Sequence, residues 1–254
     1  MKKLSQKISN SQKSSIRKLF ELVLTAKNAI SFGIGQPDFG PPDYVNEAII
    51  SALKAGKSQY APTLGLPDLR ENISRKFREE NALSWVNPEN VMVTNGGSHA
   101  LQLAYAALSN PGDEMIVSSP NFLSYYYLAG FYGLDCVEVP RKPDFSPDIE
   151  TIASKITDKT KFIIINSPNN PTGYTYTKKQ VQTVAELVKE NDLYLISDEV
   201  YEKFLYDDAR HLSPASLDGM KKRTVTLNAM SKTFGAPGYR VGFVAAPTEI
   251  IELM

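Results

Sequence analysis

The feature that most constrains the fold is a regular alternation of short apolar runs with helical segments, which starts near residue 90. The strand-like runs are NVMVT (90–94), EMIVS (114–118), DCVEV (135–139), KFIIIN (161–166), LYLIS (193–197), RTVTLN (223–228) and RVGFVAA (240–246). Helical patterns such as 98–109 and 178–191 lie between them. Strands interleaved with helices predict an α/β fold, in which a mainly parallel sheet is covered by helices on both faces and forms three layers.

The chain is organised differently before residue 90. The stretch SFGIGQPDFGPPDY (31–44) is irregular and rich in glycine and proline, and two helical segments follow at 45–56 and 68–83. At the N-terminus, SSIRKLFELVLTAK (14–27) has the spacing of an amphipathic helix, which favours a basic arm over an organelle transit peptide.

Charge and cysteine content exclude several classes of function. Lysine plus arginine (28) balances aspartate plus glutamate (28), which argues against a nucleic-acid or acidic membrane surface as partner. The single cysteine, Cys136, rules out an internal disulfide, and with two histidines it makes no convincing zinc set. No segment approaches a membrane span, so we expect a soluble cytoplasmic protein without a bound metal.

Groups that bind ligands should gather at the carboxyl ends of the parallel strands. The first strand ends in NGGSHA, where a helix begins, so Gly97, Ser98 and His99 could surround a phosphate. This spacing is neither a dinucleotide fingerprint nor a P-loop, and glycine turns before helices are common. Phe122, beyond the second strand, could stack on a planar ligand or belong to the core.

The next strand ends carry further polar groups. Asn170 lies in SPNNPTGY, Asp198 ends LYLIS with Tyr201 close behind, and Lys232 with Arg240 follows RTVTLN. Each has an ordinary explanation, such as a turn asparagine, a helix cap or a solvated lysine. A buried carboxylate nevertheless needs a cation or a donor. The occurrence of these groups at successive strand ends predicts one site.

In this order the motifs resemble the large domain of the class I/II pyridoxal-phosphate (PLP) dependent aminotransferases, which have fold-type I. The resemblance covers nearly the whole chain. The matching motifs are SSIRKLFELV, ISFGIGQPDF, YAPTLGLPDLRE, VTNGGSHAL, NSPNNPTGY, ISDEVYEKF and SKTFGAPGYRVGF.

The resemblance implies a role for each group that meets the cofactor ring. Lys232 would form the internal aldimine with PLP and move a proton at the substrate Cα. Asp198 would keep the pyridine nitrogen protonated. Asn170 and Tyr201 would donate to the phenolic oxygen, and Phe122 would stack on the ring.

The same resemblance assigns the cofactor phosphate to Gly97, Ser98 and His99 on one side. Ser231 and Arg240 would face it from the other side, where the planar guanidinium suits a bidentate contact.

Two further matches concern the partner subunit and the substrate. Tyr60 matches a tyrosine that reaches the phosphate of the neighbouring subunit, which implies a homodimer with shared active sites. Gly35, whose backbone would approach the substrate carboxylate, and Asn170 are the expected substrate-binding residues.

The sequence departs from the family pattern in two places. Ala229 stands where serine or glycine is usual, so one phosphate ligand is missing or comes from elsewhere, with Asn228 as a candidate. The chain also ends at Met254, before the C-terminal small domain that carries the carboxylate-binding arginine. We therefore expect residues 1–40 to form an arm and part of a small domain, and residues 41–254 to form the PLP-binding large domain of a longer protein.

The expected activity is transfer of an amino group between an amino acid and a 2-oxo acid. Two alternatives stay open at this point. A PLP-dependent lyase, such as a carbon–sulfur β-lyase or an aminocyclopropane-carboxylate synthase-like enzyme, would share the same cofactor residues. A non-catalytic PLP-binding fragment would also retain them. A nucleotide-binding domain would leave Lys232 and Asp198 without a role.

Overall fold

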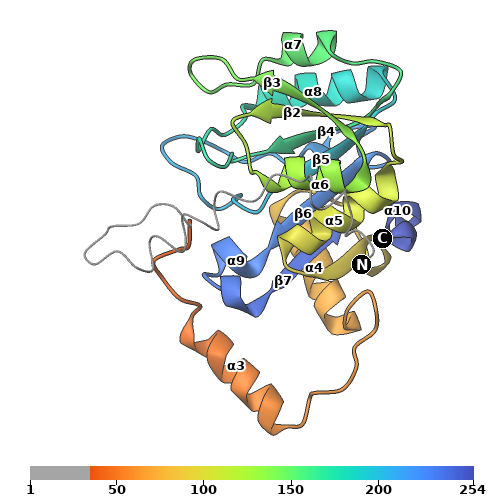
Figure 1. The fold of residues 1–254 in the computed structure, drawn as a ribbon. Helices are drawn as coiled ribbons and strands as arrows, with labels where there is room; N and C mark the ends of the chain where they lie inside the picture. The colour runs from red at the N-terminus through yellow and green to blue at the C-terminus, as the bar shows by residue number, and fades with distance from the viewer. Residues whose placement is uncertain (1–34) are drawn as a thin grey trace, which may run out of the picture.

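The protein folds into three layers, with a seven-stranded sheet between two layers of helices (Figure 1). This computed structural model describes residues 35–254, so the helix predicted at 14–27 lies outside the described residues. The strand order is β1-β7-β6-β5-β4-β2-β3. The α/β three-layer prediction is confirmed.

Each of the seven predicted strands is present within one or two residues of its expected bounds. They are β1 (Val91–Asn95), β2 (Glu114–Ser119), β3 (Asp135–Pro140), β4 (Thr160–Asn166), β5 (Tyr194–Asp198), β6 (Thr224–Ala229) and β7 (Val241–Ala245). Strand β7 pairs antiparallel with β1 and with β6, while the remaining neighbours pair in parallel. The start of β7 therefore lies at the edge where the parallel strands end.

The helices are α3 (Asp43–Lys54), α4 (Pro67–Glu80), α5 (Gly97–Leu108), α6 (Ser124–Tyr132), α7 (Ile149–Ser154), α8 (Lys178–Glu190), α9 (Met230–Thr233) and α10 (Thr248–Leu253). Residues of α5, α6 and α10 share one core cluster, and residues of α7 and α8 share another. Successive strand residues such as Ile163 and Ile164 join different clusters because side chains alternate between the two faces. Both faces are covered, which explains the uninterrupted apolar runs.

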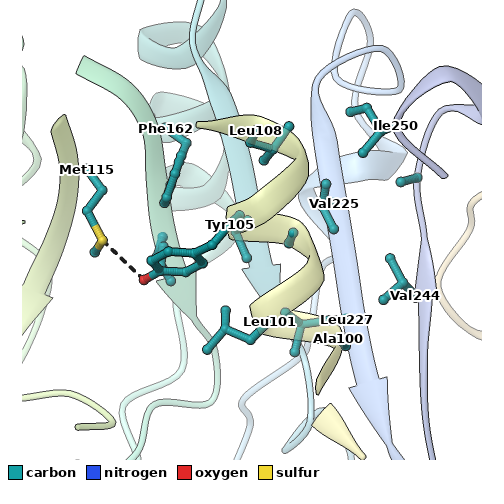
Figure 2. Close-up of a cluster of buried hydrophobic side chains, with 14 of the residues drawn as sticks. Ala100, Leu101, Tyr105, Leu108, Met115, Phe162, Val225, Leu227, Val244 and Ile250 are labelled. Carbon is teal, nitrogen blue, oxygen red and sulfur yellow. Dashed lines mark hydrogen bonds between the residues drawn. The ribbon is translucent and has the colours of Figure 1, made fainter. Parts of the chain in front are cut away.

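Helix α5 packs on the middle of the sheet, as Figure 2 shows. Its Tyr105 is fully buried, and the single proton of its hydroxyl is shared between two acceptors, the Met115 sulfur (3.1 Å) and the Tyr125 carbonyl (3.0 Å). The ring meets Phe162 edge-on at 5.1 Å between centroids. A buried tyrosine with a satisfied hydroxyl gives a well-defined packing position, which holds the N-terminus of α5 at the edge of the sheet.

Helix α3 buries none of its residues over its full length of twelve residues. It lies away from the three layers in Figure 1 and exposes Tyr44, Ile50 and Leu53. In residues 35–254 no helix is both long enough and apolar enough to cross a membrane.

Candidate active site

A cavity of about 650 Å³ lies at the edge where the parallel strands end. All of the predicted site residues line it except His99 and Tyr60. Those that line it are Gly35, Gly97, Ser98, Phe122, Asn170, Asp198, Tyr201, Ser231, Lys232 and Arg240. Residues that are far apart in the sequence therefore meet in one place.

Asp198 is a buried carboxylate at the end of β5, with 7% of its surface exposed. It accepts hydrogen bonds from the Tyr125 hydroxyl (2.7 Å) and the Val200 amide (3.2 Å), and it forms no ion pair within residues 35–254. Burial raises the pKa of Asp198 to about 6 despite these two donors. A cationic group of a ligand would therefore be held strongly at this carboxylate.

A chain of amides ties β4 to β5. The Asn166 side chain donates to the Asp198 carbonyl (3.0 Å) and accepts from the Asn170 backbone (2.7 Å). The Asn170 amide in turn donates to the Tyr201 hydroxyl (3.1 Å). Burial, with the nearby Asp198 charge, raises the pKa of Tyr201 to about 12. Tyr201 thus keeps its proton at neutral pH and can donate it to a ligand oxygen.

Lys232 belongs to the short helix α9, directly after β6. Its Nζ donates to the Gly35 carbonyl (2.5 Å) and lies 5.7 Å from the centroid of the Tyr201 ring. Burial lowers the pKa of Lys232. The neutral amine, which is the nucleophilic form, is therefore more populated than for a solvated lysine.

The turn between β1 and α5 is tightly packed at Gly96. Gly96 has φ +75°, and a Cβ on it would lie 2.4 Å from the Arg240 Nη2. A Cβ on Gly242 would lie 2.4 Å from the Gly96 carbonyl carbon. The backbone at the start of α5 is thus in direct contact with β7 and with a guanidinium.

Arg240 reaches this turn because β7 is antiparallel. It precedes β7 with φ +55°, and its Nη1 donates to the Pro237 carbonyl (2.8 Å). The guanidinium and the first amides of α5, which have no partners within the helix, face one region. A helix N-terminus beside an arginine is suited to an anion such as phosphate.

Two predicted residues lie elsewhere. The His99 ring accepts a hydrogen bond from the Asn95 amide through Nδ1 (3.1 Å), so it braces the turn and does not line the cavity. Tyr60 is fully exposed and does not line the cavity either. Its expected contact with a partner subunit stays a prediction.

The suggestion that Asn228 replaces a phosphate ligand is wrong in this structure. Leu227 and Ala229 line the active-site cavity, and Asn228 points to the other side of β6, where it lines a second cavity. Its Oδ1 accepts from the Ala229 amide (2.7 Å). Strand alternation accounts for this, because neighbouring residues of a strand face opposite sides.

Among the residues at the site that were not predicted from the sequence, three carry polar side chains. Asn166 and Asn169 line the cavity, and Tyr125 lies behind it as the donor to Asp198. Asn166 had a usable signal, since it is the last residue of the strand KFIIIN. Tyr125 had none, because one tyrosine in the run YYY is not distinguished from its neighbours by spacing.

A protein-family model described as "Aminotransferase class I and II" matches residues 27–254. The chain belongs to the class I and II aminotransferases. It is 44% identical to the aspartate aminotransferase of Pyrococcus abyssi over 95% of this chain, and 39% identical to aromatic-amino-acid aminotransferase 2 of Thermococcus litoralis over 99%. The structure of Thermus thermophilus aspartate aminotransferase with maleate is 40% identical, has a TM-score of 0.94, and matches 100% of this chain and 67% of its own.

The chain is shorter than these aminotransferases. It spans 62% of the length of the Pyrococcus abyssi relative and 65% of the Thermococcus litoralis relative.

The cofactor of this family, PLP, fits the residues present. The tight turn at Gly96 with Arg240 matches its phosphate, and the unpaired charge of Asp198 matches a protonated ring nitrogen. The amine of Lys232 lies in the same cavity as both groups. The chemistry of the donor set thus agrees with the family.

Proposed function

We propose that the whole protein is a PLP-dependent aminotransferase, which moves an amino group between an amino acid and a 2-oxo acid. One observation carries the proposal: a single cavity is lined by the Lys232 amine, the Asp198 carboxylate and the Arg240 guanidinium. These three groups complement the aldehyde, the ring nitrogen and the phosphate of PLP. The activities named for the relatives support the same reaction.

When bound, PLP supplies an aldehyde that condenses with amines and a ring that accepts electrons. Lys232 would anchor the aldehyde carbon and would later move a proton at the substrate α-carbon. Asp198 would hold the ring nitrogen in its protonated form. The amide of Asn170 and the hydroxyl of Tyr201 would donate to the ring oxygen, while Phe122 would pack against the ring.

The anionic end of PLP would lie between the start of α5 and the loop before β7. The backbone of Gly97 and Ser98 would donate from one side, and Ser231 and Arg240 from the other. Because His99 braces the turn from outside the cavity, its contribution would be to hold this backbone in place.

The names of the relatives suggest a dicarboxylic or an aromatic amino acid as the amino donor. Gly35, with φ +60°, presents its carbonyl to the Lys232 amine and would lie near the substrate carboxylate. We also propose a cytoplasmic homodimer with shared active sites, in which residues 41–254 form the large domain and residues 1–40 form an arm and part of a small domain.

Reduction with borohydride in the presence of PLP tests the cofactor assignment. We expect peptide mapping of the full protein to find a pyridoxyl group on Lys232 and none in Lys232→Ala. Lys203→Ala is the matched control, because it removes an exposed lysine five residues after Asp198, and it should be labelled like the parent protein. Labelling of another lysine, or of none, would overturn the proposal.

A second measurement separates transamination from lyase chemistry. Incubation with an amino acid and a 2-oxo acid should interconvert the pair without net loss of amino groups. A PLP-dependent lyase would instead release an elimination product from the amino acid alone, with no need for the 2-oxo acid.

A further inference from the structure

A second polar cluster lies behind Asp198, outside the active-site cavity, and is centred on Glu199. This carboxylate is completely buried. Its Oε1 accepts from the hydroxyls of Ser197 (2.9 Å) and Ser213 (2.6 Å). Its Oε2 accepts from the Asn81 amide (3.1 Å) and lies 3.0 Å from the His211 Nε2. Both oxygens are thus fully partnered.

Glu202, three residues later, joins the same cluster and is 4% exposed. Its Oε2 accepts from the Asn81 amide (2.6 Å), and its Oε1 pairs with the Lys76 ammonium. Lys76 also donates to the Asn81 Oδ1 (2.7 Å). Oxygen and nitrogen atoms of Glu199, Glu202 and His211 lie within 4.8 Å of one another, but the ammonium already present disfavours a metal ion there.

The charges of this cluster balance only when His211 is protonated. The charged groups that face the imidazole are Glu199 directly after β5, Glu202 in the following turn and Lys76 on α4. With a neutral imidazole, two carboxylates face one ammonium, and a buried negative charge is left without compensation. Arg210, the preceding residue on the same segment, is exposed.

Burial lowers the pKa of His211, but the facing carboxylate of Glu199 outweighs this and raises it overall. The reciprocal effect is seen at Glu199. Burial raises the pKa of Glu199. The charge of His211 and the hydrogen bonds of the cluster together outweigh burial, so the pKa of Glu199 is lowered overall. Both directions favour the imidazolium–carboxylate pair over a neutral imidazole.

The cluster is joined to the active site through the main chain. Glu199 directly follows Asp198, and its amide donates to the Leu227 carbonyl (2.9 Å) on β6. The Glu202 amide donates to the Glu199 carbonyl (3.0 Å), so the turn is closed on both sides of Tyr201. The turn that carries the two carboxylates is therefore the same turn that carries Tyr201 and directly follows Asp198.

We propose that His211 is a positioning residue: as an imidazolium it balances Glu199 and Glu202, and so holds the turn that presents Asp198 and Tyr201 to the cavity. The proposal rests on the proposed function, because it concerns the geometry of the PLP site. By linkage, loss of the His211 proton should weaken cofactor binding.

The first test needs no cofactor. The imidazole protons of the histidines can be followed by NMR as the pH is changed, and the signal that is missing from His211→Gln belongs to His211. We expect the His211 titration to move to lower pH in Glu199→Gln, because the facing charge is gone. An unchanged titration would overturn the charge-balance argument.

The second test measures the dissociation constant of PLP, by absorbance, across the pH range of that titration. We expect parent-protein binding to weaken by about fivefold as His211 loses its proton, the low end of coupling between linked sites. His211→Gln keeps a hydrogen-bond donor without the charge. This variant should bind PLP more weakly than the parent protein at low pH, and its dissociation constant should no longer change across the range of the His211 titration.

Lys203→Gln is the matched control. Lys203 pairs with Glu80 (2.6 Å), so it joins the same turn to the same helix α4, but both side chains are largely solvated. Lys203→Gln should show the same weakening of PLP binding with pH as the parent protein.

The inference would be overturned if this weakening persists in His211→Gln, or if the parent protein does not show it. If His211→Gln does not fold, the parent protein alone tests the inference: its PLP binding should weaken over the same pH range in which His211 loses its proton. If no PLP binds at all, the proposed function fails, and the NMR titration still tests the charge balance.

Discussion

Asp198 shows how one buried side chain both costs stability and prepares a site. Its carboxylate has lost most of its water, and in the described residues it gains two hydrogen bonds but no cation. The ionised form of Asp198 therefore costs free energy, and a positive group next to the carboxylate would offset this cost. A protonated pyridine nitrogen would be such a group, so the cost of burying the ionised carboxylate favours the proposed cofactor.

A pH dependence of stability follows from this residue. The folded pKa of Asp198 is about 6, above the value of roughly 3.9 in an unfolded chain, so the folded state binds the proton more tightly. Its contribution is fully present below the unfolded pKa and is lost as pH rises through about 4 to 6. The loss should be about 3 kcal/mol for two pKa units.

Urea unfolding of the cofactor-free protein between pH 4 and 7 measures this loss. In Asp198→Asn the new side chain is close in shape to aspartate and cannot ionise. The difference in unfolding free energy between the two proteins therefore reports the ionisation of Asp198, separately from that of Glu199 and His211. We expect the difference to change with pH in the stated window. Parallel curves for the two proteins would contradict the assignment.

At the scale of elements, the contact between β7 and the β1–α5 turn decides the geometry of the anion site. Gly242 pairs with Thr94 across β1 and with Ala229 across β6, and it lies against the backbone of Gly96. No side chain fits between them, because the nearest atoms are backbone and cannot rotate away. The phosphate side of the proposed site thus depends on strand packing as much as on Arg240.

Gly242→Ala tests this dependence. The new Cβ would lie 2.4 Å from the Gly96 carbonyl carbon and 2.7 Å from the Gly97 nitrogen, so the turn must shift. We expect a loss of about 1–3 kcal/mol in unfolding free energy, as for overpacked cores, with weaker retention of PLP. Gly238→Ala, in the same β6–β7 connection, has open space around its Cβ and should change neither quantity. Equal behaviour of the two variants would contradict the argument.

At the scale of the whole molecule, an exposed face suggests that more protein covers this chain. Helix α3 buries none of its residues, although it carries Tyr44, Ile50 and Leu53. Tyr60 lies in the connection that follows it and is also fully exposed. Apolar residues gathered on one exposed element are typical of an interface, in agreement with the proposed homodimer.

Mixing two variants of the full protein tests whether Tyr60 acts across that interface. In a mixed dimer of Lys232→Ala with Tyr60→Phe, one site combines an intact Lys232 with an intact Tyr60 from the other subunit. We expect PLP retention above the average of the two separate variants. If Tyr60 acts within its own subunit, or not at all, mixing will restore nothing.

The sequence by itself determined the seven strands, the helices between them and most of the candidate site. Apolar periodicity and turn chemistry act over a few residues, so they can be read locally. Thus Asp198 and Lys232 could be placed at strand ends before any strand order was known. The same alternation could also have shown that Asn228 faces away from Leu227 and Ala229.

Only the tertiary structure decided which strand ends meet. The order of the strands and the antiparallel direction of β7 bring Arg240 to the turn at Gly96, more than a hundred residues away in the sequence. The hydrogen bond from Tyr125 to Asp198 and the cluster around His211 likewise join distant segments. Such contacts depend on long-range pairing and on the burial of the whole sheet, and no local pattern of residues specifies them.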